Sequence, residues 1–406
     1  MAESIMKTFH VSAAGFGIIS AFYFYAYAPM QLPAGLLFDR YGPRKLMTSA
    51  LVLCAIGSFF FASTDSFITA ALGRFLIGMA SAFSFIGILV LISHWFPPHQ
   101  FAFLAGIAQM MSSVGAVFGQ VPLARLIDGV GWRNACFILA CIGLVLAALI
   151  WIVIRDYPSS NNHVTQRPKF KEEWSRLICV CRRSCTWVIG AYAFTIWTPI
   201  TIFAALWGIP YLQQKYQINI ITASGLCSMI WIGIGVGSPL LGWISDYCSN
   251  RRLALSISSL LGLVSTLSVL YLPLPFYSMY LVLFLFGIGA GGQTVSFAVV
   301  KENNPPDLVG TASGINNLAV LVGGAIFQPI VGMILYKSSD WMMINGAPVY
   351  SVQSYNKALL ILPCCYLVSL FISLFLLKES HPNHQNRLHL DVIDTSILNT
   401  NESISN

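Results

Sequence analysis

Residues 35–45 read Gly-Leu-Leu-Phe-Asp-Arg-Tyr-Gly-Pro-Arg-Lys and separate two apolar runs. Each run has about twenty residues, enough for a helix to cross a bilayer. The stretch between them holds Asp39, Arg40, Arg44 and Lys45, and a Gly-Pro pair is typical of a tight turn. Residues 35–45 therefore predict a short, charged loop between two membrane-spanning helices.

The composition extends this prediction to the whole chain. Hydrophobic residues make up 56% of the 406 residues and charged residues only 9%, whereas a soluble domain carries about 25% charged residues. Backbone groups in lipid must bond within their own segment, so each apolar run predicts a helix. We expect an all-α, polytopic membrane protein that is no enzyme and binds no nucleic acid, because the net charge of +7 comes from basic residues in short loops.

About eleven spanning helices are predicted, five in one half of the chain and six in the other. They cover residues 17–38, 46–62, 67–93, 101–126, 132–154, 186–211, 224–244, 253–272, 280–300, 310–336 and 355–377. We expect a helical bundle at 1–154, a cytoplasmic loop at 155–184, a six-helix bundle at 185–377 and a disordered cytoplasmic tail at 378–406. The basic residues of loops 39–45, 155–184 and 248–252 fall on one face, which the positive-inside rule makes cytoplasmic.

The two halves repeat one another in sequence. Val114-Gly115 recurs as Val322-Gly323, and Gln120 recurs as Gln328, both 208 residues later. Gly35 and Asp39 recur as Gly242 and Asp246, 207 residues later, and the basic pair Arg44-Lys45 recurs as Arg251-Arg252. A nearly constant offset predicts two pseudo-symmetric bundles.

The repeat also predicts a helix that the first half lacks. The helix at 186–211 opens the second half, and its counterpart would lie before Met1. We expect that Met1 is an internal methionine of a longer protein, and the alternative is a truncated gene. The opening residues, 1–16, resemble the loop that would follow this helix.

The stretch from Gly35 to Lys45 resembles the signature loop of the major facilitator superfamily, G-x-L-x-D-R-x-G-R-[RK]-[RK], with Pro43 as a departure. The resemblance implies two six-helix bundles that alternate access to a central site. It also implies that Asp39 contacts the helix start near residues 310–313, and Asp246 the one near 101–104, to hold the cytoplasmic side shut. The gating residues implied in this way are Gly35, Asp39, Arg40, Gly42, Arg44, Lys45, Gly242, Asp246, Arg251 and Arg252.

Arg74 is the clear ionisable residue inside a predicted span, which makes it the first candidate for substrate binding or ion coupling. Arg74-Phe-Leu-Ile-Gly78 resembles a second motif of the family, R-x-x-x-G. The alternative is a structural Arg bonded to backbone carbonyls. Polar and aromatic residues in other spans complete the candidates: Gln109, Trp197, Gln293 and Asn317.

The resemblance implies a secondary transporter for an amino acid, a dipeptide or a carboxylate, closest to bacterial uptake members and lysosomal dipeptide transporters. The alternatives are a drug or metabolite exporter, for which the poor antiporter signature at 115–122 is unfavourable, and a transport-dead sensor or remnant. We expect a monomer in the bacterial inner membrane, with a proton or sodium ion as possible co-substrate and with no cofactor or metal.

Overall fold

The computed structural model describes residues 2–96, 101–156, 177–304, 308–338, 341–344 and 347–380. Most of the predicted central loop (157–176) and of the predicted tail (381–406) lies outside the described residues. The side chains of Asp39 and Arg40 and the surroundings of Gly35 also lie outside them.

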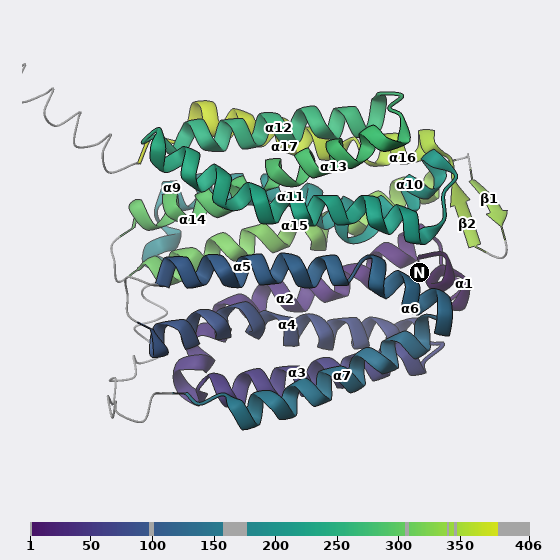
Figure 1. The fold of residues 1–406 in the computed structure, drawn as a ribbon, viewed down its shortest axis with the longest axis horizontal. Helices are drawn as coiled ribbons and strands as arrows, with labels where there is room; N and C mark the ends of the chain where they lie inside the picture. The colour runs from purple at the N-terminus through teal and green to yellow at the C-terminus, as the bar shows by residue number, and fades with distance from the viewer. Residues whose placement is uncertain are drawn as a thin grey trace, which may run out of the picture.

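The described first half consists of helices that run back and forth along one direction (Figure 1). Ten helical stretches of the described chain are long and apolar enough to cross a membrane, and α2 is an eleventh long helix of 29 residues. The elements of this half are α1 (Ala2–Thr8), α2 (Ala13–Tyr41), α3 (Pro43–Ser63), α4 (Phe67–Trp95), α5 (Phe101–Phe118), α6 (Val121–Val130) and α7 (Trp132–Val153).

The second half adds six spans, several of them built from consecutive shorter elements. These elements are α9 (Ser184–Pro199), η2 (Ile200–Trp207), α10 (Gly208–Tyr216), α11 (Ile220–Tyr247), α12 (Arg251–Tyr271), α13 (Phe276–Ala290), α14 (Gly292–Glu302), α15 (Val309–Lys337), α16 (Val352–Ala358), α17 (Ile361–Phe371) and η3 (Ile372–Leu376). The predicted all-α membrane fold with about eleven spans is therefore confirmed.

Three local features differ from uninterrupted helices. The span predicted at 101–126 breaks at Gly119-Gln120 into α5 and α6, where Pro122 begins the second helix. The span that opens the second half changes to a π-helix at Ile200, directly after Pro199, whose ring nitrogen has no hydrogen to donate. A short antiparallel hairpin, β1 (Trp341–Ile344) and β2 (Ala347–Tyr350), lies between α15 and α16.

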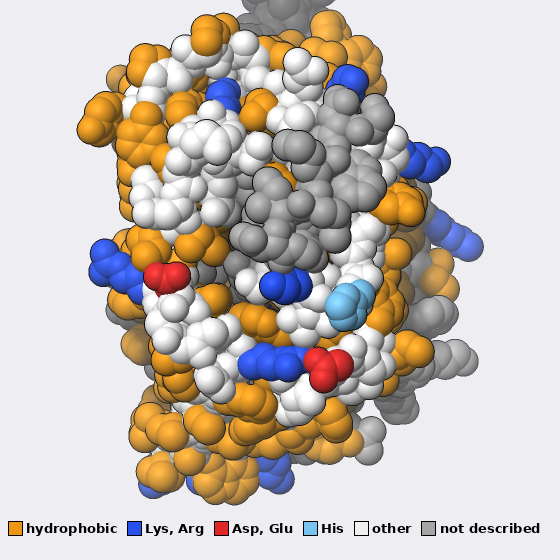
Figure 2. Space-filling model, turned by 90° about the vertical axis from the view of Figure 1, so that its right-hand side faces the viewer, with side chains coloured by type: hydrophobic (Ala, Val, Ile, Leu, Met, Phe, Trp, Pro, Cys, Tyr) orange, Lys and Arg blue, Asp and Glu red, His pale blue; other side chains and the backbone are white. Residues whose placement is uncertain are grey.

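The ends of the molecule differ in their loops (Figure 1). One end, which we call the hairpin end, carries α1, α6, β1 and β2. The opposite end, which we call the signature end, carries the turns at Gly42 and Ser249, both with positive φ. Figure 2 looks onto the hairpin end, where hydrophobic side chains gather along the flanks and scattered charged side chains lie in the middle. This distribution suits a molecule whose sides face lipid and whose ends face water.

The two halves meet mainly where α2 packs along α15, with a smaller contact between α5 and α11. Toward the hairpin end, a Cβ added at Gly17 would lie 2.7 Å from the carbonyl oxygen of Gln328. Toward the signature end, the amide of Asn317 donates to Oε1 of Gln31 over 2.9 Å. On the α5–α11 side, Gly235 of α11 lies near Ser113 of α5.

Candidate functional site

Arg74 lies in α4, and the main chain of α2 crosses beside it. Its guanidinium carbon lies 5.2 Å from the centre of the Tyr23 ring, within the range of a cation–π interaction. One turn further along α4, a Cβ at Gly78 would overlap the carbonyl oxygen of Tyr23. Arg74 and Gly78 thus both contact Tyr23, because residues four apart lie on the same face of a helix.

In the second half, α11 and α13 cross in the same way as α2 and α4, but without a charged residue at the crossing. A Cβ at Gly287 of α13 would overlap the carbonyl oxygen of Ile230 on α11, which is the counterpart of Tyr23 in the repeat. One turn before Gly287 stands Leu283, which is fully buried. The close helix approach therefore needs the glycine, and it does not need an arginine.

The guanidinium of Arg74 has N–H donors without a hydrogen-bond partner among the described residues. Among the residues that the structure describes, it makes no hydrogen bond or ion pair, and it lies over the face of Tyr23 and near the thiols of Cys54 and Cys136. A guanidinium carries five N–H donors and keeps its charge under all physiological conditions. Arg74 therefore stays a candidate for binding an anionic group.

The other predicted binding residues lie on separate helices. Gln109 and Trp197 are partly exposed on α5 and α9, while Gln293 is buried on α14. Asn317 pairs with Gln31 where α15 meets α2. No described contact joins any of these residues to Arg74, so their roles in binding stay predictions.

The first copy of the signature loop is held by an acid that the sequence analysis did not single out. Oδ1 of Asp156, just beyond α7, accepts from the backbone N–H of Arg44 over 2.7 Å. A Cβ at Gly42, where φ is +79°, would lie 2.7 Å from this carboxyl group, so both the backbone and the space require glycine there. The Arg44 side chain donates to the carbonyl of Trp151 over 2.7 Å and lies 4.4 Å from its ring.

In the second copy, the described charged side chains pair with one another. Arg251 donates to Asp246 over 2.6 Å and to Glu302 over 2.7 Å, and both partners belong to the same half. Glu379, beyond η3, accepts from the backbone N–H groups of Arg251 and Arg252 over 2.9 and 3.0 Å. The predicted closing contacts of Asp39 and Asp246 with the opposite half stay predictions, because the residues at 101–103 and the Asp39 side chain lie outside the described side chains.

Asp156 and Glu379 make equivalent hydrogen bonds in the two halves. Each follows the last helix of its half and satisfies backbone N–H groups at the start of the helix that follows the signature loop. Such groups at a helix start have no partner within the helix and favour a negative charge. A sequence signal was present, since each acid stands two residues after the predicted final span of its half.

Comparison with known proteins agrees with this architecture. The family model described as Major Facilitator Superfamily matches residues 1–328 and 193–399. The "Probable galactarate/D-glucarate transporter GarP" of Escherichia coli K12 is 24% identical, over 92% of this chain and 88% of its own. The "Hexuronate transporter" of Bacillus subtilis is 23% identical (86% and 87%), and the "Probable sulfoacetate transporter SauU" of Cupriavidus necator is 23% identical (85% of each).

Solved structures share the fold at low identity. A bacterial homologue of the human lysosomal transporter Spinster, in an inward-facing and unoccupied conformation, superposes with a TM-score of 0.70 at 16% identity, over 92% of this chain and 91% of the other. A D-xylose–proton symporter superposes with a TM-score of 0.67 at 14% identity, over 93% of each chain. With its repeated halves, its signature loop and a family match over most of its length, the chain belongs to the major facilitator superfamily and is a multi-pass secondary transporter.

Proposed function

We propose that this transporter carries a small organic anion with one or more carboxylates, and that Arg74 binds a carboxylate of the substrate. The observation that carries the proposal is the half-buried guanidinium inside a spanning helix, which lies over the Tyr23 ring and makes no hydrogen bond or ion pair among the described residues. Arginine and a carboxylate form paired, charge-assisted hydrogen bonds with fixed geometry. An incoming carboxylate would supply the acceptors that the protein leaves out.

The equivalent crossing in the second half supports this reading. If Arg74 were needed for packing, the crossing of Gly287 with Ile230 would need a similar residue, yet Leu283 occupies that place. A charge at the centre of a spanning helix costs about 2.5–3.5 kcal/mol for insertion into a membrane, and Arg74, the eighth of 29 residues in α4, bears a part of that cost. An ionisable residue inside a spanning helix is, by default, expected to have a function.

The relatives are named for substrates of one chemical kind. Galactarate and D-glucarate, hexuronate and sulfoacetate are all organic anions. This agreement favours the carboxylate among the predicted substrate classes over the amino acid and the dipeptide. At identities of 22–24% the relatives support the class of substrate, not its identity.

For orientation, we propose that the signature end faces the cytoplasm, which also places Glu379 and the chain beyond it on that side. The turns before Arg44-Lys45 and Arg251-Arg252 both lie at this end, as the positive-inside rule requires. Asp246 and Glu302 lie near helix ends there. A proton or sodium gradient as the driving force is a prediction that the transport assay tests directly.

The test is uptake into liposomes that contain the purified protein. Labelled D-glucarate, D-glucuronate, an amino acid and a dipeptide are compared, each with a proton gradient, with a sodium gradient and with none. We expect saturable uptake of the acids, reduced about 10- to 100-fold in Arg74→Leu, because losing hydrogen bonds to a charged group costs about 1.5–3 kcal/mol. Arg125→Leu, which removes an exposed arginine of α6, is the matched control and keeps full uptake.

Two results would overturn the proposal. Uptake of the amino acid or the dipeptide with none of the acids would assign a different substrate class. Uptake of the acids at equal rates by the wild type and Arg74→Leu would remove Arg74 from the binding site.

A further inference from the structure

The second half is longer than the first at one place, the connection before its last span. Helix α15 begins 208 residues after its counterpart α5, at 309 against 101, whereas α16 begins 220 residues after α7, at 352 against 132. The difference of 220 − 208 is twelve residues, and the hairpin of β1 and β2 lies in this stretch. The repeat therefore identifies the hairpin as an addition to the second half.

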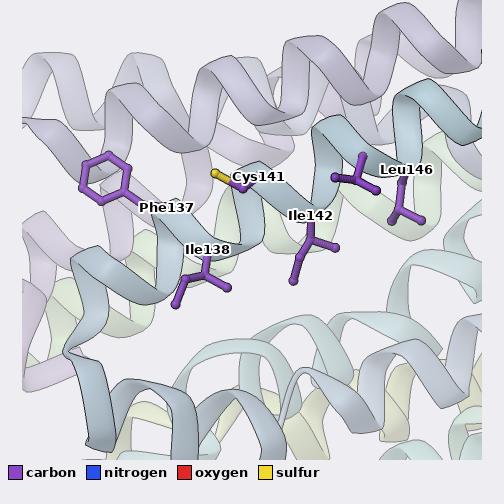
Figure 3. Close-up of a pocket in the computed structure, with 6 residues that line it drawn as sticks. Phe137, Ile138, Cys141, Ile142 and Leu146 are labelled. Atoms are coloured by element: carbon purple, nitrogen blue, oxygen red, sulfur yellow. The ribbon is translucent and has the colours of Figure 1, made fainter.

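The first half makes the same connection with a single residue. Gly131, with φ of +80°, joins α6 directly to α7. Beyond this turn α7 is an apolar helix, and its Ile138 and Ile142 side chains point away from it (Figure 3). One residue is thus enough to connect these two helices, so the fold does not need the hairpin for the connection itself.

The hairpin of the second half reaches the first half. Strand β2 packs against α1, which precedes α2 in the chain (Figure 1). At the end of β2, the hydroxyl of Tyr350 accepts from the backbone N–H of Ala13 over 3.3 Å, and both residues are buried. The N–H groups in the first turn of a helix have no partner within the helix. The second half therefore supplies an acceptor to the start of α2.

The start of α11, which matches the start of α2, shows what the hairpin adds. Ser12 and Asn219 cap α2 and α11 alike, since each side chain accepts from the N–H three residues later. Among the described residues, no side chain accepts from the N–H of Ile220, which lies 207 residues after Ala13. The contact with Tyr350 is thus an addition to the capping that the two halves share.

Aromatic rings fix Tyr350 to its own half. The ring of Tyr350 meets that of Tyr355 edge to face, with 6.3 Å between the ring centres, and Tyr355 meets Tyr211 of α10 in the same way at 5.9 Å. The hydroxyl of Tyr211 donates to the carbonyl oxygen of Val269 on α12 over 2.8 Å. These contacts join Tyr350 to α16, α10 and α12, so its hydroxyl moves together with the second half.

Helices of the two halves touch at the same level. A Cβ at Gly332 of α15 would overlap the carbonyl oxygen of Ala13 in the first turn of α2. A transporter that opens its site to one side at a time parts its halves at each end in turn. When the hairpin end opens, the hydrogen bond between Tyr350 and Ala13 breaks, and so does the contact of β2 with α1.

We propose that the β1–β2 hairpin is a strap that holds the hairpin end closed, acting through the hydrogen bond between Tyr350 and Ala13. The strap shifts the population of the transporter toward the state whose site opens at the signature end, because it adds contacts in that state alone. It depends on alternating access by the two halves, and it does not depend on the substrate or on Arg74.

Distances between spin labels on the two halves test the proposal. p-Acetylphenylalanine replaces Asp128 of α6 and Tyr277 of α13, both exposed at the hairpin end, and the label attached to it leaves the native cysteines unmodified. A second pair, at Phe96 and Tyr247, is exposed at the signature end. Pulsed electron–electron resonance measures both pairs in the purified protein in lipid nanodiscs, without substrate.

Tyr350→Phe removes the hydroxyl and keeps the ring. The ratio of long to short distances at the hairpin end is expected to rise about 2- to 10-fold, as the loss of one neutral hydrogen bond predicts. The signature end is expected to change in the opposite direction. Tyr216→Phe is the matched control and leaves both ratios unchanged, because its hydroxyl donates to the carbonyl of Leu274 within the second half over 2.9 Å.

A second variant removes the strap itself. One glycine joins Ser338 to Ser351, as Gly131 joins α6 to α7, and the ratio at the hairpin end is expected to rise further than in Tyr350→Phe. An unchanged ratio in Tyr350→Phe would overturn the proposal, whether or not the shortened variant folds. An equal rise in Tyr216→Phe would overturn it as well. Because the labels are measured without substrate, these outcomes are distinct from failure of the proposed anion binding.

Discussion

The crossing of α2 with α4 and the crossing of α11 with α13 are built alike, but only the first carries a charge. In both crossings a glycine lets one helix lie against a backbone carbonyl of the other, at Gly78 and at Gly287. One turn earlier the first crossing has Arg74 and the second has the fully buried Leu283. The comparison shows that a crossing of this kind forms without a charge, which supports the proposed role of Arg74 in binding substrate.

The largest expected effect concerns the shared part of this comparison. Gly78→Ala and Gly287→Ala each place a methyl group on a backbone oxygen that cannot move without separating the helices. We expect each to cost about 3 kcal/mol or more and to abolish the monodisperse peak in size-exclusion chromatography. Gly143→Ala is the control, since its Cβ would meet only the Ala55 side chain at 3.9 Å. Normal folding of either crossing variant would contradict the account.

The next effect concerns the two signature loops. Arg251→Ala leaves Glu302, whose side chain is 13% exposed, without its main counter-charge, and we expect a loss of about 2–3 kcal/mol. Arg44→Ala removes one bond to a carbonyl and one ring contact, for about 1 kcal/mol. Thermal unfolding followed by tryptophan fluorescence ranks the two variants. Equal midpoints would show that the charged network of the second loop adds nothing.

A smaller effect is expected from the two acids that cap α3 and α12. Asp156→Ala and Glu379→Ala each remove an acceptor of backbone N–H groups, and such caps contribute about 0.5–2 kcal/mol. Glu379 accepts from two N–H groups and Asp156 from one, so the Glu379 variant loses more. The same unfolding assay measures both, with the exposed Asp128→Ala as the control. A larger loss for Asp156→Ala would reverse the predicted order.

The smallest effect on stability belongs to Arg74 itself. Because Leu283 fills the matching position, Arg74→Leu is expected to leave the unfolding midpoint unchanged or to raise it slightly. A structural arginine would behave differently, since removing its bonds to backbone carbonyls would lower the midpoint. The unfolding midpoint of Arg74→Leu therefore decides between the two readings before any substrate is known.

The sequence predicted those features that depend on composition and on spacing alone. Hydropathy located the spans, and the offset of 207–208 residues revealed the repeat, so the family and the two halves could be recognised. The offset also paired Gly115 with Gly323 and Gln120 with Gln328 before any contact was visible. Arg74 could be singled out because a charge inside an apolar run is rare.

The remaining features depend on how helices are rotated and where they cross. Nothing in the spacing shows that Tyr23 lies against both Arg74 and Gly78, because the two helices are far apart in the chain. The capping by Asp156 and Glu379 joins residues more than a hundred positions apart. Even the π-helical segment after Pro199 depends on neighbours as well as on the proline, since Gln328 of α15 binds its Thr201 carbonyl.

The most direct test of Arg74 as an anion receptor is a binding measurement with two ligands that differ in charge. Isothermal titration of the purified protein compares D-glucarate with D-glucitol, its neutral counterpart with alcohols in place of both carboxylates. The account predicts that the wild type prefers D-glucarate by about 10- to 100-fold and that Arg74→Leu loses this preference. An unchanged preference in Arg74→Leu would contradict it.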